Sequence, residues 1–185
     1  MIRGIRIQPV TRESWDAFAR FFEAKGSPHY CWCTLYRLCG GRKASTTQKR
    51  ASMLKLVEAK MPIGLLACKG TEPVGWCSVA PRKTYARLER SRTMPRVTSS
   101  ETPTWTVLCF FVAQPYRHQH IASALLEAAV AYAREQGAEV VEGYPFDSAG
   151  ITSTHRGHSR MFKALGFRLE GKRWCRRIGR GRFAR

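Results

Sequence analysis

The sequence predicts a single α/β domain in which one mixed, mostly antiparallel sheet carries helices on both faces. Three observations support this prediction. A strand–turn–helix unit over Thr104–Gly137 supplies one parallel crossover, two strand-like runs flank the turn Gly70–Pro73, and a further pair of short runs closes the chain. The chain has 185 residues, of which 44% are hydrophobic, and shows no internal repeat, so residues 1–185 are expected to form one domain around one core.

The first half of the chain predicts a strand, two helices and a hairpin. Alternating apolar residues indicate the strand, and apolar residues three or four apart indicate a helix with one buried face, here Trp15, Phe18, Ala19 and Phe22. The expected elements are a strand over Ile2–Val10, a helix from Thr11 or Ser14 to about Lys25, a helix over Gln48–Ala59 that Thr46 or Thr47 begins, and hairpin strands Ile63–Lys69 and Val74–Val79.

The second half opens with a polar connection, Met94–Pro103, which we expect to loop across a site. Thr106–Val112 is apolar almost without a break and suits a strand buried on both faces, which Pro115 ends. A helix follows the turn Tyr116–His120, and Gly137 stops it. The expected inward face of this helix is Ile121, Leu125, Ala128 and Tyr132, and the remaining expected elements are strand Glu139–Glu142, helix Ser159–Leu165 and strands Phe167–Glu170 and Trp174–Ile178.

The chain is strongly basic, with 32 Lys and Arg against 13 Asp and Glu and a formal net charge of +19. This charge favours an anionic partner such as a nucleic acid, a polyphosphate cofactor or an acidic surface, although a basic bias that serves solubility explains it equally. Two segments concentrate it: Arg82–Arg96 and Lys172–Arg185. No run of 18 apolar residues and no apolar signal segment is present, so we expect no membrane span and a cytoplasmic protein.

The seven cysteines are expected to be reduced thiols, which the cytosol maintains. Four potential metal ligands lie within eleven residues: His29, Cys31, Cys33 and Cys39. Zinc sites need wider gaps and a second, separated ligand pair, so we predict no metal site. We interpret this stretch as an aromatic-rich loop whose Trp32 and Tyr36 line a pocket, with simple packing as the alternative. Three further cysteines in strand-like runs are expected in the core: Cys68, Cys77 and Cys109.

The turn before the helix at Ile121 is a candidate anion site. A strand–turn–helix unit aims the first free N–H groups of the helix, and the positive end of its dipole, into the turn, which suits a phosphate or pyrophosphate. An ordinary βα unit without a ligand is the alternative that geometry alone leaves open.

The order of elements and two motifs resemble the GNAT superfamily of acyl-CoA-dependent N-acetyltransferases over nearly the whole chain. The first motif, Arg117-His-Gln-His-Ile-Ala122, is similar to the superfamily pattern (Arg/Gln)-x-x-Gly-x-(Gly/Ala) at the start of the helix that binds the pyrophosphate of acetyl-CoA. The second, Phe162-Lys-Ala-Leu-Gly166-Phe167, matches a late aromatic-x-x-x-Gly-Phe element. Glu142–Pro145 and Cys31–Cys33 are similar to one bacterial branch whose acceptor is unassigned.

The resemblance implies that acetyl-CoA is the co-substrate. Its pantetheine arm would lie along the central strand, and a backbone N–H near Val112 would be the oxyanion donor. Arg117 would add a charge-assisted bond to a phosphate. The cofactor-binding residues implied by the resemblance are Phe111, Val112, Arg117, His118, Gln119, His120, Ile121, Ala122 and Ser123.

Three residues depart from the superfamily pattern. His118 and His120 stand at positions where glycine is frequent, and a positive φ at His120 would cost about 1–2 kcal/mol. We expect CoA binding to be retained, because Arg117, Ala122 and the helix remain. Phe162 stands where many members carry the tyrosine that protonates the leaving thiolate, and phenylalanine cannot do this.

Other residues are therefore needed for proton transfer. Glu142, at the end of the strand after the crossover, is the best-placed general base by topology, with Glu101 as the runner-up. Tyr144, Ser159 and His155 are candidates for the proton donor.

The leading interpretation is an N-acetyltransferase that transfers acetyl from acetyl-CoA to a primary amine by direct attack, with a small-molecule acceptor. Trp32, Tyr36, Trp76 and the loop Pro95–Glu101 would form the acceptor wall. One alternative is an amine carried on RNA, such as a charged tRNA, which the two basic segments suggest. Another is a degenerate domain that binds an anionic partner without catalysis. The resemblance also allows a homodimer, because this fold often pairs through its late strands.

Overall fold

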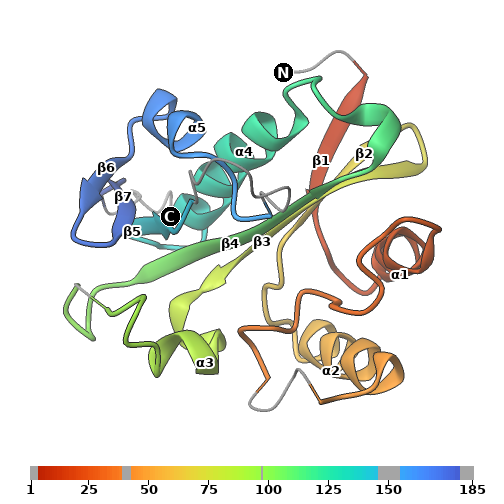
Figure 1. Ribbon diagram of the computed structural model, residues 1–185, viewed down its shortest axis with the longest axis horizontal. Coiled ribbons are helices and arrows are strands. Elements are labelled where there is room, and N and C mark those ends of the chain that lie inside the picture. The colour runs from red at the N-terminus through yellow and green to blue at the C-terminus, as the bar shows by residue number, and fades with distance from the viewer. Residues whose placement is uncertain (1–3, 39–42, 97, 146–154, 180–185) are drawn as a thin grey trace, which may run out of the picture.

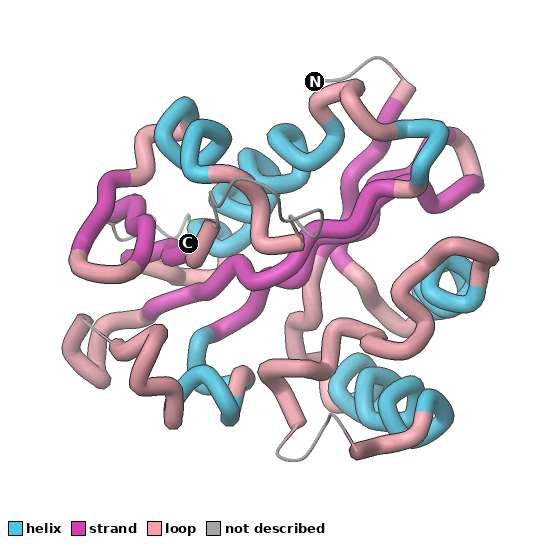
Figure 2. The backbone as a smooth tube through the Cα atoms, in the orientation of Figure 1, coloured by secondary structure: helices cyan, strands magenta, loops and turns pink. Residues whose placement is uncertain are grey.

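A seven-stranded sheet lies between two layers of helices in the computed structural model, which describes residues 4–38, 43–96, 98–145 and 155–179 (Figures 1 and 2). The strands are β1 (Ile5–Pro9), β2 (Leu65–Lys69), β3 (Glu72–Pro81), β4 (Thr104–Val112), β5 (Val140–Gly143), β6 (Arg168–Glu170) and β7 (Arg173–Arg177). The helices are α1 (Trp15–Glu23), α2 (Thr46–Glu58), α3 (Ala86–Glu89), α4 (Ile121–Glu135) and α5 (Ser159–Ala164), with short 3-10 turns η1 (Arg82–Thr84) and η2 (Gln114–Tyr116).

The strand order is β1-β2-β3-β4-β5-β7-β6. Only the β4–β5 pair is parallel, and α4 makes the crossover between these two strands; every other neighbouring pair is antiparallel. The predicted mixed, mostly antiparallel sheet is thereby confirmed, including both hairpins. Among the described residues, no helix is both long and apolar enough to span a bilayer.

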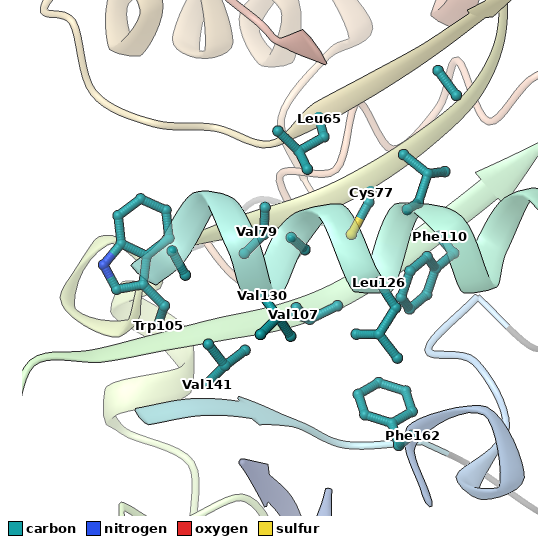
Figure 3. Close-up of a cluster of buried hydrophobic side chains, with 14 of the residues drawn as sticks. Leu65, Cys77, Val79, Trp105, Val107, Phe110, Leu126, Val130, Val141 and Phe162 are labelled. Carbon is teal, nitrogen blue, oxygen red and sulfur yellow. The ribbon is translucent and has the colours of Figure 1, made fainter. Parts of the chain in front are cut away.

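Helix α4 covers one face of the sheet and buries the main apolar cluster beneath it (Figure 3). Its first turn approaches β3 very closely, since a Cβ on Gly75 would lie 2.9 Å from Cγ2 of Ile121. The predicted inward face is half right. Ile121 and Leu125 are buried, but Ala128 and Tyr132 are only partly buried, because the buried face is wider and includes Leu126, Ala129, Val130 and Ala133.

Helices α1 and α2 cover the opposite face with a second, aromatic-rich cluster. The four residues predicted to face inward from α1 are all buried. Trp32 and Trp76 have no exposed surface, and Trp32 stacks on Phe22 with ring centroids 5.5 Å apart. These two tryptophans therefore belong to the core, and their prediction as parts of a pocket wall was wrong. The structure therefore agrees with the alternative interpretation, in which this loop serves simple packing.

The helix starts differ in detail from the predicted ones. Ser14 precedes α1 but caps nothing in it, since its Oγ accepts the backbone N–H of Thr11 at 2.9 Å. Helix α2 begins at Thr46, as predicted, but its cap is Ser45, which forms a capping box with Gln48. Helix α3 and η1 lie in the basic segment Arg82–Arg96, where no helix was predicted, because four residues are too few to show a helical period.

The cysteine-rich loop is held by packing and hydrogen bonds. The Nε1–H of Trp76 points to Sγ of Cys33 at 2.9 Å. Cys39 lies outside the described residues, and within those that are described no group of three or more His, Cys, Asp or Glu side chains is arranged to hold a metal ion.

Candidate active site

The edge of β4 becomes free at the middle of the sheet. Its parallel pairing with β5 runs from Thr104 opposite Val140 to Val107 opposite Gly143 and extends no further. Leu108 then has no partner in β3, because Val107 pairs with Val79 and Cys109 with Ser78. An extra residue of this kind bends a strand and changes its direction. The last residues of β4 therefore leave β5, and among the described residues no other strand pairs with them on that side.

Two residues of β4 direct their backbone groups to this free edge. The N–H of Ala113 donates to the carbonyl of Val74 at 3.0 Å, so the N–H of Val112, one residue earlier, points away from β3. The N–H of Phe110 points the same way and donates to the carbonyl of His155 at 2.5 Å. Phe111 alternates toward β3, and its ring packs on Phe21 with centroids 5.3 Å apart. The predicted set contained Phe111, but Phe110 is the neighbour that shares the free edge with Val112.

The turn from β4 to α4 is shaped as an anion cradle. His118 and His120 adopt left-handed backbone conformations, with φ of 61° and 59°. Within the described part of the chain, no hydrogen bond is recorded from the backbone N–H groups of residues 118–123. Successive free N–H groups in such a turn, at the start of a 15-residue helix, attract an anion. His120 thus has the positive φ that glycine would adopt more easily, and His118 shares it.

The side chains of this turn are held outward. The Nε of Arg117 donates back to the carbonyl of Val112 at 3.1 Å, and Nε2 of Gln119 donates to the carbonyl of Pro115 at 3.0 Å. The rings of His118 and His120 are exposed, whereas Ile121 is buried against the sheet. The turn is therefore fixed at both ends: Arg117 fastens it to β4, and Ile121 fastens it to the core.

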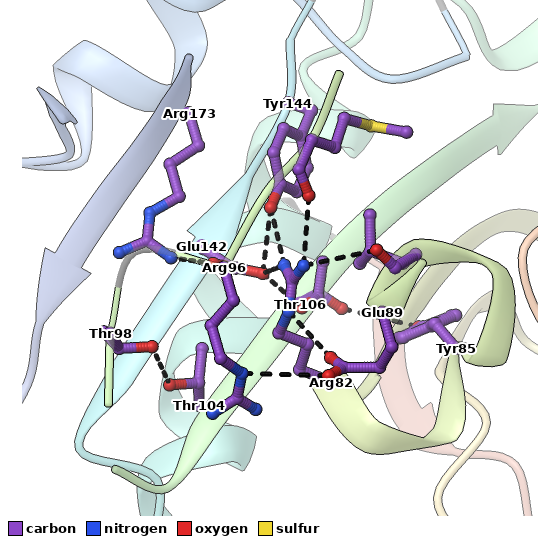
Figure 4. Close-up of polar contacts among 12 residues, drawn as sticks. Arg82, Tyr85, Glu89, Arg96, Thr98, Thr104, Thr106, Glu142, Tyr144 and Arg173 are labelled. Atoms are coloured by element: carbon purple, nitrogen blue, oxygen red, sulfur yellow. Dashed lines mark hydrogen bonds and ion pairs between the residues drawn. The ribbon is translucent and has the colours of Figure 1, made fainter. Parts of the chain in front are cut away.

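Glu142, the predicted general base, has no exposed surface. It lies opposite Thr106 in the β4–β5 ladder, and Oγ1 of Thr106 donates to its Oε1 at 2.9 Å. Its two oxygens also form ion pairs with the buried guanidiniums of Arg82 and Arg173 (Figure 4). No amine can reach this carboxylate in this arrangement. The geometry therefore argues for Glu142 as a buried anion that holds charged neighbours in place.

Tyr144, the predicted proton donor, shares this network. Its phenol oxygen lies 2.6 Å from Nη1 of Arg82 and donates to Oε1 of Glu142 at 3.2 Å (Figure 4). Burial, reinforced by the charge of Glu142, raises the pKa of the Tyr144 phenol above its usual value. The phenol therefore stays protonated at neutral pH. Tyr144 directly follows the last residue of β5, at the point where β4 no longer pairs with β5.

Arg82 connects this network to the segment between β3 and β4. Its Nη2 donates to the carbonyl of Met94 at 3.0 Å, and its Nε pairs with Glu89 at 2.8 Å. Below the segment, a third apolar cluster joins Tyr85, Leu88 and Met94 to Leu108 and Tyr144. Tyr36 of the predicted acceptor wall packs against this cluster and is only partly buried, unlike Trp32 and Trp76.

Sequence reasoning did not find Arg82 or Arg173. Both were counted only as members of the two basic segments, and their side chains are 0% and 1% exposed. The sequence separation of 60 residues between Arg82 and Glu142 leaves no local signal of this pair.

The remaining candidates lie elsewhere. Ser159 is the first residue of α5 and is half-buried. His155 contributes its carbonyl to the β4 edge, and Glu101 is exposed in the loop before β4. Phe162 is fully buried, and its ring leaves no room for a side chain at position 143, because a Cβ on Gly143 would lie 2.2 Å from it. Phe162 therefore serves packing.

Comparison with known proteins gives one family. The sequence model of the acetyltransferase (GNAT) family matches residues 15–167. No curated protein matches the chain.

Several solved structures share the fold. A GNAT family acetyltransferase from Brucella melitensis in complex with acetyl-CoA is 13% identical, with a TM-score of 0.52 over 96% of this chain and 90% of that one. The protein yncA from Salmonella typhimurium, solved with its cofactor acetyl-CoA, is 14% identical, with a TM-score of 0.55 and 95% of both chains covered. A GCN5-related N-acetyltransferase from Kribbella flavida is 13% identical, with a TM-score of 0.58 over 95% of this chain and 98% of that one. At these identities the likeness shows the fold alone.

Proposed function

The chain belongs to the GNAT acetyltransferase family, and from this premise we propose that it transfers an acetyl group from acetyl-CoA to a primary amine by direct attack. The observation that carries the proposal is the free edge of β4 beside the cradle of residues 118–123. Acetyl-CoA joins a pyrophosphate to an extended arm, and the two features would bind these parts side by side. Two similar structures are described with acetyl-CoA, which supports this ligand.

The cradle would bind the pyrophosphate through its backbone N–H groups. Those of His118, Gln119, His120, Ile121, Ala122 and Ser123 are the proposed donors. Arg117 keeps its Nη groups for a charge-assisted bond, while its Nε holds the turn to Val112. The helix dipole of α4 adds to the attraction.

The edge of β4 would align the thioester. Val112 offers an N–H on the free edge, and this group is the proposed oxyanion donor for the thioester carbonyl. Phe110 lies two residues earlier on the same edge, but its N–H is engaged by His155. The neutral amine then attacks the acetyl carbon, the C–S bond breaks, and CoA leaves as a thiolate that takes up a proton. The attacking nitrogen releases its extra proton to water, which restores the proton donor.

Tyr144 is the proposed source of that proton. Burial raises the pKa of this phenol, so the hydroxyl is protonated at neutral pH, and donation requires its O–H, which Glu142 now accepts at 3.2 Å, to turn toward the thiolate. Glu142 and Arg82 position it through the contacts at 3.2 Å and 2.6 Å. Ser159 remains the competing prediction.

The test is release of free thiol from acetyl-CoA in the presence of a panel of primary amines. The proposal predicts amine-dependent release, whereas CoA binding without turnover on any amine would favour the degenerate-domain alternative. Tyr144→Phe should lower kcat by about 100-fold and leave the affinity for CoA unchanged. A loss of that size in Ser159→Ala, with Tyr144→Phe fully active, would assign the donor to Ser159 instead.

The acceptor, the cellular location and the oligomeric state stay predictions. The sequence favours a small-molecule amine, a cytoplasmic protein and a pairing through the late strands. The charge distribution of the surface bears on the acceptor.

A further inference from the structure

The segment that carries η1 and α3 presents exposed basic side chains along its length. Its exposed basic side chains are Lys83, Arg87, Arg90 and Arg92, and we call these four residues the α3 patch. Within the described residues, none of the four forms an ion pair with a carboxylate. Like charges gathered without counter-charges raise the local potential, which is costly unless an anion binds there.

The one acid in this segment does not offset the patch. Glu89 pairs with Nε of the buried Arg82 at 2.8 Å, and its second oxygen lies 3.8 Å from Nε of Arg96. Its carboxylate, on a side chain that is 36% exposed, is thus shared by two arginines outside the patch, one of which also binds Glu142. The α3 patch therefore keeps its positive charge. The count of six basic residues against one acid in Arg82–Arg96 underestimates how basic this surface is.

The patch is also held rigidly. Arg82 fastens the segment from beneath by donating to the carbonyls of Leu88 at 3.4 Å and Met94 at 3.0 Å. The backbone N–H of Arg87 donates to the carbonyl of Tyr36 at 3.0 Å, which ties α3 to the loop after α1. The backbone of the segment is thereby ordered before a partner binds, so binding has to order only the four side chains.

The chemistry of the surface selects among anionic partners. The apolar residues of the segment, Leu88 and Met94, point inward, and the large apolar residues exposed within the described chain, Tyr30 and Leu169, lie elsewhere. Insertion into a lipid surface needs exposed apolar groups, and the buried centre of a protein interface is enriched in them. Purely electrostatic attraction to an anionic membrane needs none, and the vesicle experiment separates it from RNA binding. Four separate exposed cations instead match a line of phosphates, and a nucleic acid supplies one.

We propose that the α3 patch is a docking surface for the phosphate backbone of RNA. RNA is favoured over DNA because RNA presents its reactive groups in loops and free ends, whereas the amino groups of duplex DNA are paired. The patch lies over the cluster that contains Leu108 and Tyr144, so a docked RNA would bring an attached amine toward the end of β5. This last step and the choice of RNA over DNA rest on the proposed function, whereas binding of a phosphate backbone does not and is tested without catalysis.

The experiment measures fluorescence anisotropy of a labelled, deacylated tRNA titrated with the full chain at about 50 mM and about 200 mM salt. The patch variant replaces Lys83, Arg87, Arg90 and Arg92 with Gln. The matched control replaces four exposed basic residues outside the segment with Gln, and so lowers the net charge equally: Arg12, Arg20, Lys25 and Lys60.

The proposal predicts that the wild-type chain binds the tRNA and that binding weakens at higher salt. The patch variant should bind at least tenfold more weakly, with a flatter salt dependence, since each lost phosphate contact reduces the slope by about 0.7–0.9. The control should bind within about twofold of wild type. Equal loss in both variants would show that net charge alone is responsible and would overturn the proposal.

Three further outcomes would overturn it. These are no tRNA binding by the wild type at low salt, equally tight binding of a duplex DNA of the same length, and equally tight binding of phosphatidylserine vesicles. Acetyl-CoA affinity, measured on the same variants, should be unchanged, which separates this proposal from the proposed function. If the patch variant does not fold, the single reversal Arg90→Glu, with Lys60→Glu as its control, decides the question.

Discussion

Two histidines at the start of α4 hold a backbone conformation that costs free energy for any residue with a Cβ. His118 and His120 have φ of 61° and 59°, and His120 is the residue that precedes the first helical position. The strain is about 1–2 kcal/mol per residue, and the fold accepts it because Arg117 and Ile121 fix both ends of the turn. The cradle thus keeps the shape that glycine would give and adds two exposed imidazoles at its rim.

This strain gives the first prediction. His120→Gly should stabilise the fold by up to about 1 kcal/mol, because relief of the strain exceeds the added chain entropy of glycine. The affinity for acetyl-CoA should be equal or tighter. Denaturant unfolding and calorimetry measure the two effects.

Lys60→Gly is the matched control, since Lys60 has φ of 56° at the end of α2, away from the cradle. It should gain similar stability with no change in affinity. A large loss of CoA affinity in His120→Gly alone would show instead that the imidazole contacts the ligand.

At the scale of elements, one buried carboxylate joins four parts of the fold. Glu142 on β5 contacts Thr106 on β4, Arg173 on β7 and Arg82 at the end of β3. Through Arg82 the same network reaches α3 and the carbonyl of Met94. These strands and the segment that carries the α3 patch are therefore held in register by ionic contacts at the point where β4 leaves β5.

The second prediction concerns this junction. Glu142→Gln should destabilise the fold by about 3–5 kcal/mol, because it leaves two buried guanidiniums without their shared anion. Glu89→Gln, which removes a partly exposed partner of Arg82, should cost less than about 1 kcal/mol. Unfolding in urea compares the two, and equal costs would contradict the account of Glu142 as the structural anion.

Helices and strands were predictable from the sequence wherever a local residue pattern determines them. The partners of individual side chains were not predictable. The hairpin, the parallel crossover and the helix stop at Gly137, whose φ is 83°, follow from periodicity and turn chemistry. The role of Arg82 depends on Glu142, 60 residues later, and a basic residue near a turn carries no sign of such a partner. Trp32 was misassigned for the same reason. An aromatic residue in a loop gives the same sequence pattern whether it lines a pocket or packs in the core.

At the scale of the whole molecule, burial controls the response to alkaline pH. Burial is the main cause that raises the pKa of Cys31 to about 11, of Tyr85 to about 12 and of Cys175 to about 12. Each of these groups is more easily deprotonated in the unfolded chain than in the folded one. Their contribution to stability is therefore complete below the unfolded pKa values of about 8.5 for thiols and 10 for phenols.

The third prediction follows from this sign. The free energy of unfolding in urea, measured with a reductant present, should be nearly constant up to about pH 8 and should fall by several kcal/mol by about pH 11. Stability that rises over this range would contradict the buried, protonated state of these groups. The loss should be smaller in Tyr85→Phe, which removes one of the titrating groups.

The central claim is that acetyl-CoA binds at the cradle of residues 118–123 beside the free edge of β4. Calorimetric titration of the chain with acetyl-CoA tests it most directly, with Ala122→Glu placing a carboxylate in the first turn of α4 and Ala131→Glu as an exposed control later on the same helix. The account predicts one site per chain with a Kd between about 1 μM and 1 mM, at least tenfold weaker in Ala122→Glu and unchanged in Ala131→Glu. No saturable binding by the wild-type chain at millimolar acetyl-CoA, or binding that Ala122→Glu leaves intact, would contradict it.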